Sequence, residues 1–332
     1  MFPIAVDAMA GDHGPDPIIE GALAAARDDG VPVVLVGREE RLRGALPGGT
    51  LPERVRIVAA DDVMGMDDAP TVALRHRGRL SIRVAAGEVA AGRAAALFSA
   101  GNTGGTVMAA HEAFGMLAGV DRPALAATVP TCKHAAVLLD VGANVQCRPQ
   151  HLVQFAAMGA VFARVSLGVA VPRVGLLSIG EEESKGNELT REAHHLLKAS
   201  GLNFIGNIEA RDVYAGDADV IVCDGFTGNI ALKISEGLVE MVGEVLEDAL
   251  ARLGAGSADA PACHAAFDLF RKRVDYSESG GAPLLGVAGL TLVGHGRSSS
   301  KAVRHGVTLA HRFAAAGLIA RIQQDIHLAG VR

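Results

Sequence analysis

Short runs of aliphatic residues alternate along the chain with longer segments whose apolar residues recur every three to four positions. The short runs predict strands that are buried on both faces, and the longer segments predict amphipathic helices. Strand-like runs lie at 4–8, 31–37, 55–60, 95–101, 135–142, 173–180 and 219–225, and helix-like segments lie at 16–30, 151–168 and 187–201. This alternation predicts an α/β fold with a doubly wound, mostly parallel sheet, in one domain over residues 1–332.

A long helical pattern over 229–253 interrupts this alternation. Its apolar face carries Ile234, Leu238, Val242 and Val245, and its acidic face carries Glu236, Glu240, Glu244 and Glu247. A turn of small residues and a second helical pattern follow, so we expect a helical excursion over about 236–275. Two interpretations remain open: a helix pair facing the core, or an exposed hairpin used for dimerisation or membrane contact. The acidic face disfavours attraction to anionic lipid, which favours dimerisation.

Composition narrows the classes of protein. Hydrophobic residues make up 49% of the 332 residues, but aromatic residues only 4%, so Ala, Val, Leu and Gly must fill the core. The net charge of −6 argues against a nucleic-acid-binding protein. The four cysteines lack C-x-x-C spacing, which favours reduced thiols in a cytoplasmic protein. The N-terminus does not resemble a signal peptide, and no apolar stretch of membrane-spanning length occurs.

Polar turns follow five of the predicted strands, at 7–17, 99–106, 140–149, 178–188 and 223–230. The carboxyl ends of parallel strands lie at one edge of a sheet, so we expect these turns to converge on one crevice. The turns at 99–106 and 223–230 place small residues before a helix, where backbone N–H groups and the helix dipole can bind an anion. Helix capping by Asn102, Thr103, Thr227 or Asn229 is the alternative at each single turn.

Several catalytic signatures are absent from the sequence. It contains no G-x-G-x-x-G, G-x-x-x-x-G-K-[ST], G-x-S-x-G or H-E-x-x-H motif, which disfavours nicotinamide dehydrogenases, P-loop NTPases, serine hydrolases and zinc peptidases. The twelve histidines are scattered, so we expect no metal site. His295 lies among Gly and Ser residues and is a candidate for a site, although a structural loop histidine fits equally well.

Long segments of the chain resemble one known family. "VDAMAGDHGPD", "SAGNTGG", "LLDVGANVQCRPQHLVQFAAMG", "IGEEESKGNELT", "GDADVIVCDGFTGNIALKISEG" and "SGGAPLLGVAGLTLVGHGRSSSKA" are similar to the phosphate acyltransferases of bacterial phospholipid synthesis, the PlsX type. The resemblance runs in order over residues 4–302. The chain departs from the family's pattern at Ala10, where Gly is usual, at Arg297, and throughout the helical excursion.

The resemblance implies a reaction and partners. A fatty acyl group moves from acyl carrier protein to inorganic phosphate, and a membrane acyltransferase uses the resulting acyl phosphate to acylate glycerol 3-phosphate. It also implies a homodimer, a fold like those of isopropylmalate dehydrogenase and phosphotransacetylase, and peripheral association with the membrane. Phosphate is itself the nucleophile, so we expect no cofactor and no covalent enzyme nucleophile.

Candidate site residues come from the polar turns. The resemblance points to Lys185 and Asn229 as catalytic; from the residues alone, Lys185 could instead offset the glutamates before it, and Asn229 could also be an N-cap. The expected substrate-binding residues are Asp7, Ser99, Gly101, Asn102, Thr103, Asn144, Asn187, Asp224, Gly225, Thr227, Gly228 and His295. We expect Asp7 and Asp224 to orient donors, because carboxylates repel phosphate.

An acidic carrier protein needs a basic patch on this net acidic chain. The two candidates are the segment 75–83 and the run Arg271, Lys272 and Arg273. Three other functions remain open: a phosphotransacetylase-like enzyme that uses acyl-CoA, a dehydrogenase of the isopropylmalate type, and a non-catalytic membrane scaffold. Donor preference and dependence on NAD would separate the enzymes.

Overall fold

The computed structural model describes residues 2–253, 260–274 and 280–328. The strands are β1 (Ile4–Asp7), β2 (Val33–Gly37), β3 (Val55–Ala59), β4 (Ala96–Ser99), β5 (Ala124–Pro130), β6 (Ala135–Leu139), β7 (Val174–Leu177), β8 (Phe204–Ile208), β9 (Val220–Val222), β10 (Ala282–Leu285) and β11 (Thr291–Val293). Within the described residues they form a single sheet in the order β3-β2-β1-β4-β11-β10-β5-β6-β9-β7-β8. Every strand-like run of the sequence contains one of these strands, and β5, β8, β10 and β11 are additional.

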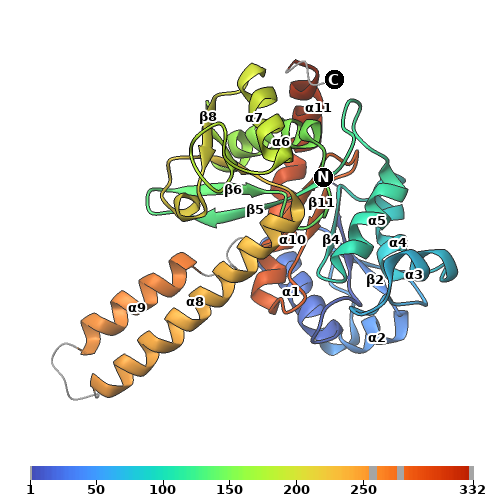
Figure 1. The fold of residues 1–332 in the computed structure, drawn as a ribbon. Coiled ribbons are helices and arrows are strands. Elements are labelled where there is room, and N and C mark those ends of the chain that lie inside the picture. The colour runs from blue at the N-terminus through green and yellow to red at the C-terminus, as the bar shows by residue number, and fades with distance from the viewer. Residues whose placement is uncertain (1, 254–259, 275–279, 329–332) are drawn as a thin grey trace.

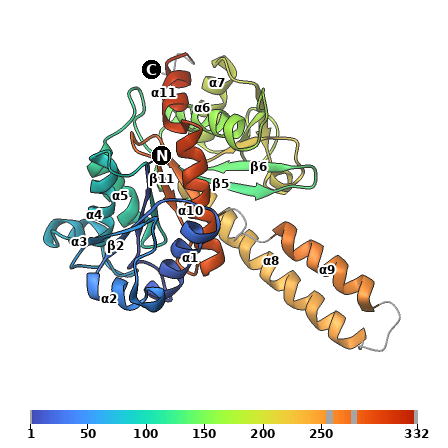
Figure 2. The same ribbon diagram turned by 180° about the vertical axis from the view of Figure 1, so that it is seen from behind.

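Helices cover both faces of the sheet. They are α1 (Pro15–Asp28), α2 (Glu39–Gly44), α3 (Pro70–His76), α4 (Ser81–Ala90), α5 (Thr103–Phe114), α6 (Pro149–Ser166), α7 (Glu188–Ala199), α8 (Gly225–Leu253), α9 (Ala260–Val274), α10 (Ser300–Ala315) and α11 (Leu318–Leu328), with short 3₁₀ turns at Pro47–Gly49 and Ala210–Tyr214. Figure 1 shows α3, α4, α5 and the start of α8 over one face, and Figure 2 shows α1, α6, α10 and α11 over the other. The α/β prediction is confirmed.

Small aliphatic residues fill the core, as the composition requires. Helix α6 is buried along most of its length, and its Phe155 and Phe162 are among the largest fully buried side chains. Gly159 of this helix has no room for a side chain, because a Cβ there would lie 2.7 Å from a methyl group of Val220 in β9. Close approach of helix and sheet therefore depends on small residues.

The strands do not all point the same way. β10 pairs antiparallel with β11 and with β5, and β5 pairs antiparallel with β6, while the other pairings are parallel. Consequently β6, β7, β8 and β9 run opposite to β1–β4 and β11. The expectation that all the polar turns lie at one edge of the sheet is therefore wrong.

The register shows how the two halves still meet. Leu292 pairs with Pro283, Leu284 pairs with Leu125, and the neighbouring Ala126 pairs with Leu139. The last residue of β6 is therefore level with Leu292, one residue before the end of β11. The carboxyl ends of β6 and β11 therefore lie at nearly the same height in the sheet. The two strands run in opposite directions, so the turns that follow them point away from each other. An element that runs across the face of the sheet is needed to join them.

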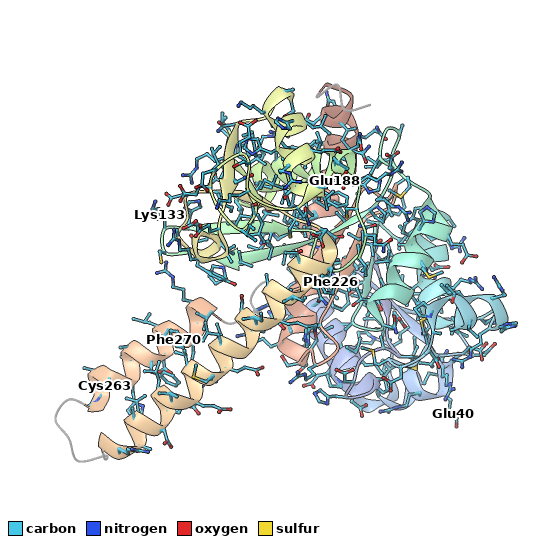
Figure 3. All side chains as sticks on the ribbon, viewed as in Figure 1. Glu40, Lys133, Glu188, Phe226, Cys263 and Phe270 are labelled. Carbon is cyan, nitrogen blue, oxygen red and sulfur yellow. The ribbon has the colours of Figure 1, made fainter. Side chains whose placement is uncertain are left out.

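Helix α8 is that element, and it continues far beyond the sheet. Its first turns pack on β5 and β6 through Ala231 and Leu232. The remainder projects from the body with α9 as a helical hairpin (Figures 1 and 2), and in Figure 3 Phe226 lies where the hairpin leaves the body. Ile234 and Leu238 are 65% and 55% exposed. The interpretation of a core-facing helix pair is therefore wrong: the hairpin is exposed, and its use for dimerisation or membrane contact stays a prediction.

The predicted excursion over 236–275 falls within α8 and α9, of which α8 already begins at Gly225; residues 254–259 and 275 lie outside the described residues. All four cysteines are free thiols. Among the described helices, none combines the length and the apolar character needed to cross a membrane.

Candidate active site

A pocket of about 520 Å³ lies where α8 passes the turns of the other half of the sheet. One wall comes from the turns after β1, β4 and β11, with Asp12, Gly101, Thr103, His295 and Arg297. The opposite wall comes from α8, with Asn229, Leu232, Lys233 and Glu236, and from Gly142 after β6. Leu125, Ala127, Val141 and Val293 also line it. Polar walls therefore enclose a largely apolar floor.

The N-terminus of α5 forms part of this pocket. Asn102 caps the helix, because its Oδ1 accepts the Gly105 N–H at 2.9 Å while its Nδ2 donates to the Met66 carbonyl at 2.7 Å. The backbone N–H groups of Thr103 and Gly104 donate no hydrogen bond to any other residue in the described part of the chain. Thr103 lines the pocket and Gly104 is the next residue of the helix, so two donors at the positive end of a helix dipole are available for an anion at this edge of the pocket.

Asp7, the last residue of β1, fixes the turn after β4 through hydrogen bonds. The Ser99 hydroxyl donates to Asp7 Oδ2 at 2.9 Å, and the Gly101 N–H donates to Ser99 Oγ at 3.2 Å. Burial raises the pKa of Asp7, against the opposing effect of hydrogen bonds from Ser81 and Ser99. Asp7 therefore orients a donor and does not itself line the pocket.

Asp140 organises the turn after β6, a role that the sequence reasoning missed. Its Oδ1 accepts the N–H groups of Leu125, Gly142 and Ala143 at 2.9–3.1 Å. Its Oδ2 accepts both the N–H and the Nδ2 of Asn144 at 2.8 Å. Burial raises the pKa of Asp140, and these hydrogen bonds act in the opposite direction. An acidic residue directly after a buried strand and two residues before Gly-Ala-Asn is the sequence signal that could have identified it.

Asn144 and the first residues of α8 are occupied by contacts within the protein. Asn144 is buried, and its carbonyl accepts the Gly225 N–H at 2.8 Å. Asp224 accepts the N–H of Thr227 at 2.9 Å through Oδ1 and the Thr227 hydroxyl at 2.8 Å through Oδ2. The Asp224 carbonyl accepts the Gly228 N–H at 2.9 Å. Asp224 is therefore the cap of α8, and Thr227 and Asn229 are not.

Asn229 has a different environment from these neighbours. It lines the pocket one turn into α8, and its carboxamide makes no hydrogen bond with another described residue. Gly142 approaches it closely, since a Cβ on this glycine would lie 3.7 Å from the Asn229 side chain. The carboxamide is thus free to bind a ligand.

Lys185 and Asn187 lie in the turn after β7, outside the lining of this pocket. Lys185 is exposed, and its backbone N–H donates to the Glu182 carbonyl at 3.0 Å. Asn187 caps α7, accepting the Thr190 N–H at 2.9 Å. The roles predicted for these two residues stay predictions, and the geometry brings neither of them to Asn229's pocket.

Two cations of the pocket were missed as site residues. Lys233 lies four residues after Asn229, so the helical period alone places both on one face. Arg297 was noted only as a departure from the family pattern. His295 was predicted and does line the pocket: its Nδ1 accepts the Arg297 N–H at 3.2 Å, and its Nε2 lies 4.0 Å from Glu236 Oε2.

Comparison with known proteins identifies the family. Residues 2–321 match the family model described as "Fatty acid synthesis protein". The chain is 47% identical over 326 residues to the phosphate acyltransferase of Acidobacterium capsulatum, covering 97% of this chain and 96% of that protein. It is 46% identical to the phosphate acyltransferase of Geobacter sulfurreducens, covering 97% and 94%. The chain belongs to the phosphate acyltransferase family. It is therefore an acyltransferase enzyme.

Solved structures support the fold of this phosphate acyltransferase. The phosphotransacetylase of Streptococcus pyogenes superposes with a TM-score of 0.65 at 15% identity, covering 95% of this chain and 94% of that one. The branched-chain phosphotransacylase of Enterococcus faecalis gives a TM-score of 0.57 at 15% identity, covering 95% and 99%. These likenesses establish a phosphotransacetylase-like α/β fold.

The predicted basic patch of the phosphate acyltransferase is partly engaged by its own chain. Arg271 contacts Glu247 at 3.4 Å and lies over the Phe267 ring. Arg273 donates to backbone carbonyls of the β5–β6 turn. Lys272 makes no ion pair with a described residue. In the segment 75–83, Arg77, Arg79 and Arg83 pair with Asp68, Asp61 and Glu112. No group of three His, Cys, Asp or Glu residues suited to a metal occurs in the described ranges.

Proposed function

We propose that this phosphate acyltransferase moves a fatty acyl group from acyl carrier protein to inorganic phosphate. The acyl phosphate product would serve a membrane acyltransferase that acylates glycerol 3-phosphate, the first acylation of phospholipid synthesis. The observation that carries the proposal is one pocket with an open helix N-terminus, the unoccupied Asn229 carboxamide and an apolar floor. These features suit an anion, a thioester carbonyl and an acyl chain, respectively.

The reaction balances without a covalent enzyme intermediate. A phosphate oxygen attacks the carbonyl carbon of the thioester and forms the new C–O bond. The carbonyl oxygen becomes an oxyanion in the tetrahedral intermediate, which collapses as the C–S bond breaks. The sulfur leaves with the electron pair as thiolate and takes up a proton, giving the thiol of the carrier protein. The protein's contribution is positioning and electrostatic stabilisation.

The pocket suggests a place for each reacting group. Phosphate would bind the Thr103 and Gly104 N–H groups of α5, on the turn that Ser99 and Gly101 support. The Asn229 carboxamide would donate to the developing oxyanion; one such donor contributes roughly 10²–10³-fold to the rate. The acyl chain would lie on Leu125, Ala127 and Val293. Lys185 remains a catalytic proposal from the family resemblance and needs an approach of its turn toward the substrate.

The homodimer is also a proposal. Ile230, Ile234, Leu238, Met241 and Val245 form an exposed apolar stripe along α8 with spacings of three to four residues. A second copy of the chain would cover this stripe. We expect Leu238→Glu to convert a dimer into a monomer in sedimentation velocity, and Glu240→Gln, on the acidic face, to leave the dimer intact. A wild-type monomer would refute the proposal.

Carrier-protein docking and location complete the proposed function. Lys272, together with the neighbouring Arg271 and Arg273, offers a positive segment to the acidic carrier protein. We place the enzyme in the cytoplasm, with peripheral membrane contact, because its acyl phosphate product would be consumed by a membrane enzyme. Nothing in the charge of the chain favours nucleic acid.

The second candidate uses acyl-CoA as donor, and the phosphotransacetylase-like fold favours testing it. The deciding experiment mixes the purified protein with palmitoyl-acyl carrier protein and inorganic phosphate. Hydroxylamine traps acyl phosphate while the released thiol is followed in parallel. Phosphate-dependent formation of both products supports the proposal. Product from palmitoyl-CoA alone would favour the second candidate, and no product from either donor would overturn both.

A further inference from the structure

Lys233 is the cation that shares a wall of the pocket with Asn229. The two residues are four positions apart in α8, so they occupy the same helix face on successive turns. Both line the pocket. The Lys233 ammonium makes no hydrogen bond or ion pair with another residue in the described part of the chain, whereas Lys133 and Lys198 are paired with Asp217 and Glu183. No described residue therefore neutralises its charge.

The charges of the pocket require such a cation. Asp12 and Glu236 both line it and would repel phosphate. The α5 N-terminus offers only about half a positive charge. His295 faces Glu236 at 4.0 Å, and Arg297 follows Gly296, where a Cβ would lie 2.7 Å from the Asp12 carboxylate. Arg297 belongs to the opposite wall, and Lys233 is the cation on the wall that carries Asn229 and the acidic Glu236.

We propose that Lys233 is a phosphate-binding residue of this enzyme. Its ammonium pairs with the phosphate that the Thr103 and Gly104 N–H groups hold, and it keeps the nucleophilic oxygen beside the thioester that Asn229 binds. This inference rests on the proposed function and adds to it the residue that supplies the positive charge for binding phosphate. It assigns phosphate affinity to α8, and not to Lys185, whose turn does not line the pocket. The four-carbon side chain gives the ammonium the reach that this needs.

The test compares Lys233→Met, Lys233→Arg and Lys185→Met with the wild type. The control is Arg312→Met, which removes an exposed cation of α10 that does not line the pocket. Two quantities are measured at low ionic strength: the Kd of inorganic phosphate by isothermal titration without donor, and the KM for phosphate in the hydroxylamine assay. Thermal melting checks that each variant folds.

We expect Lys233→Met to weaken phosphate binding about 10–100-fold, the loss of one charge-assisted hydrogen bond. The KM for phosphate should rise in parallel, while kcat at saturating phosphate changes by less than about threefold. Lys233→Arg should recover most of the affinity, because the positive charge is kept. Lys185→Met and Arg312→Met should bind phosphate as the wild type does.

Three outcomes would overturn the inference. If Lys233→Met binds phosphate as tightly as the wild type while the wild type turns over, the inference fails and the proposed function survives. If kcat falls but Kd and KM for phosphate do not change, Lys233 acts after phosphate has bound. If Lys185→Met is the only variant that weakens phosphate binding, the cation that binds phosphate is Lys185 in the turn after β7. A wild type that neither binds phosphate nor turns over would overturn the proposed function together with this inference.

Discussion

Arg273, at the end of α9, donates from Nη2 to the backbone carbonyl of Thr131 at 2.9 Å and to that of Cys132 at 3.1 Å. Both carbonyls belong to the turn between β5 and β6, near Lys133 in Figure 3. Within the described residues, the helical hairpin is attached to the body where α8 begins after β9 and through the Arg273 guanidinium at the end of α9. The orientation of the hairpin depends on this second attachment.

Removal of that attachment should loosen α9 without unfolding the body. We expect Arg273→Met to increase amide hydrogen exchange in residues 260–274 severalfold, with little change in the melting temperature. Lys272→Met is the matched control, because Lys272 is exposed on the same turn and makes no such contact. Equal exchange in the two variants would show that the guanidinium does not hold α9.

Two glycines of α8 should respond oppositely to alanine. A Cβ on Gly228 would lie 1.9 Å from the Asp140 carbonyl oxygen, so Gly228→Ala must displace buried backbone and should cost about 3 kcal/mol or more. A Cβ on Gly237 meets nothing within 4 Å, so Gly237→Ala should stabilise the helix by about 0.5–1 kcal/mol. Urea unfolding measures both. A mild Gly228→Ala would contradict the close approach of α8 to the β6 turn.

Substitution of Asn229 should lower catalysis without changing stability, whereas substitution of Asn102 should lower stability. Asn229→Ala removes a carboxamide with no partner in the described chain, so we expect an unchanged melting temperature and a kcat lower by roughly 10²–10³-fold. Asn102→Ala removes the α5 cap and the bond to Met66, so we expect a stability loss of about 1–2 kcal/mol. Thermal melting and the hydroxylamine assay measure both. An Asn229→Ala variant with normal turnover would remove Asn229 from the mechanism.

Asp219 should give the protein an acid-dependent part of its stability. Burial alone would raise its pKa, but hydrogen bonds from Arg173 and His134 outweigh this and lower the pKa to about 2. Because the folded pKa lies below the unfolded value, the contribution is present above about pH 4 and is lost as the pH falls toward 2. It amounts to about 2 kcal/mol.

The measurement is urea unfolding between pH 2 and pH 6. Asp219→Asn should be less stable than the wild type at pH 6 and should show a flatter pH dependence. Asp217→Asn is the control: its pKa is lowered by Lys133, but the pair is exposed, so the effect should be small. Identical pH profiles for Asp219→Asn and the wild type would refute the assignment.

The local sequence was sufficient for seven of the strands and for the aliphatic character of the core. Continuous aliphatic runs predicted β1, β2, β3, β4, β6, β7 and β9, because burial on both faces leaves no polar position in such strands. β10 and β11 have only four and three residues and lie in a glycine-rich segment, so periodicity could not distinguish them from loops. Yet β10 takes part in two of the three successive antiparallel pairings, β11–β10, β10–β5 and β5–β6, and this odd number of pairings reverses the second half of the sheet.

The family, the reaction class and the residue types of the turns were therefore determined by the sequence alone, since they depend on residues that are close together along the chain. Only the tertiary structure decided which turns share a pocket. Lys185 and Asn229 both follow strands of the same half, but only Asn229 lies on a helix that crosses the sheet toward the Thr103 turn. Strand direction and register depend on pairing between distant segments, and three successive antiparallel pairings were enough to redirect half of the predicted site.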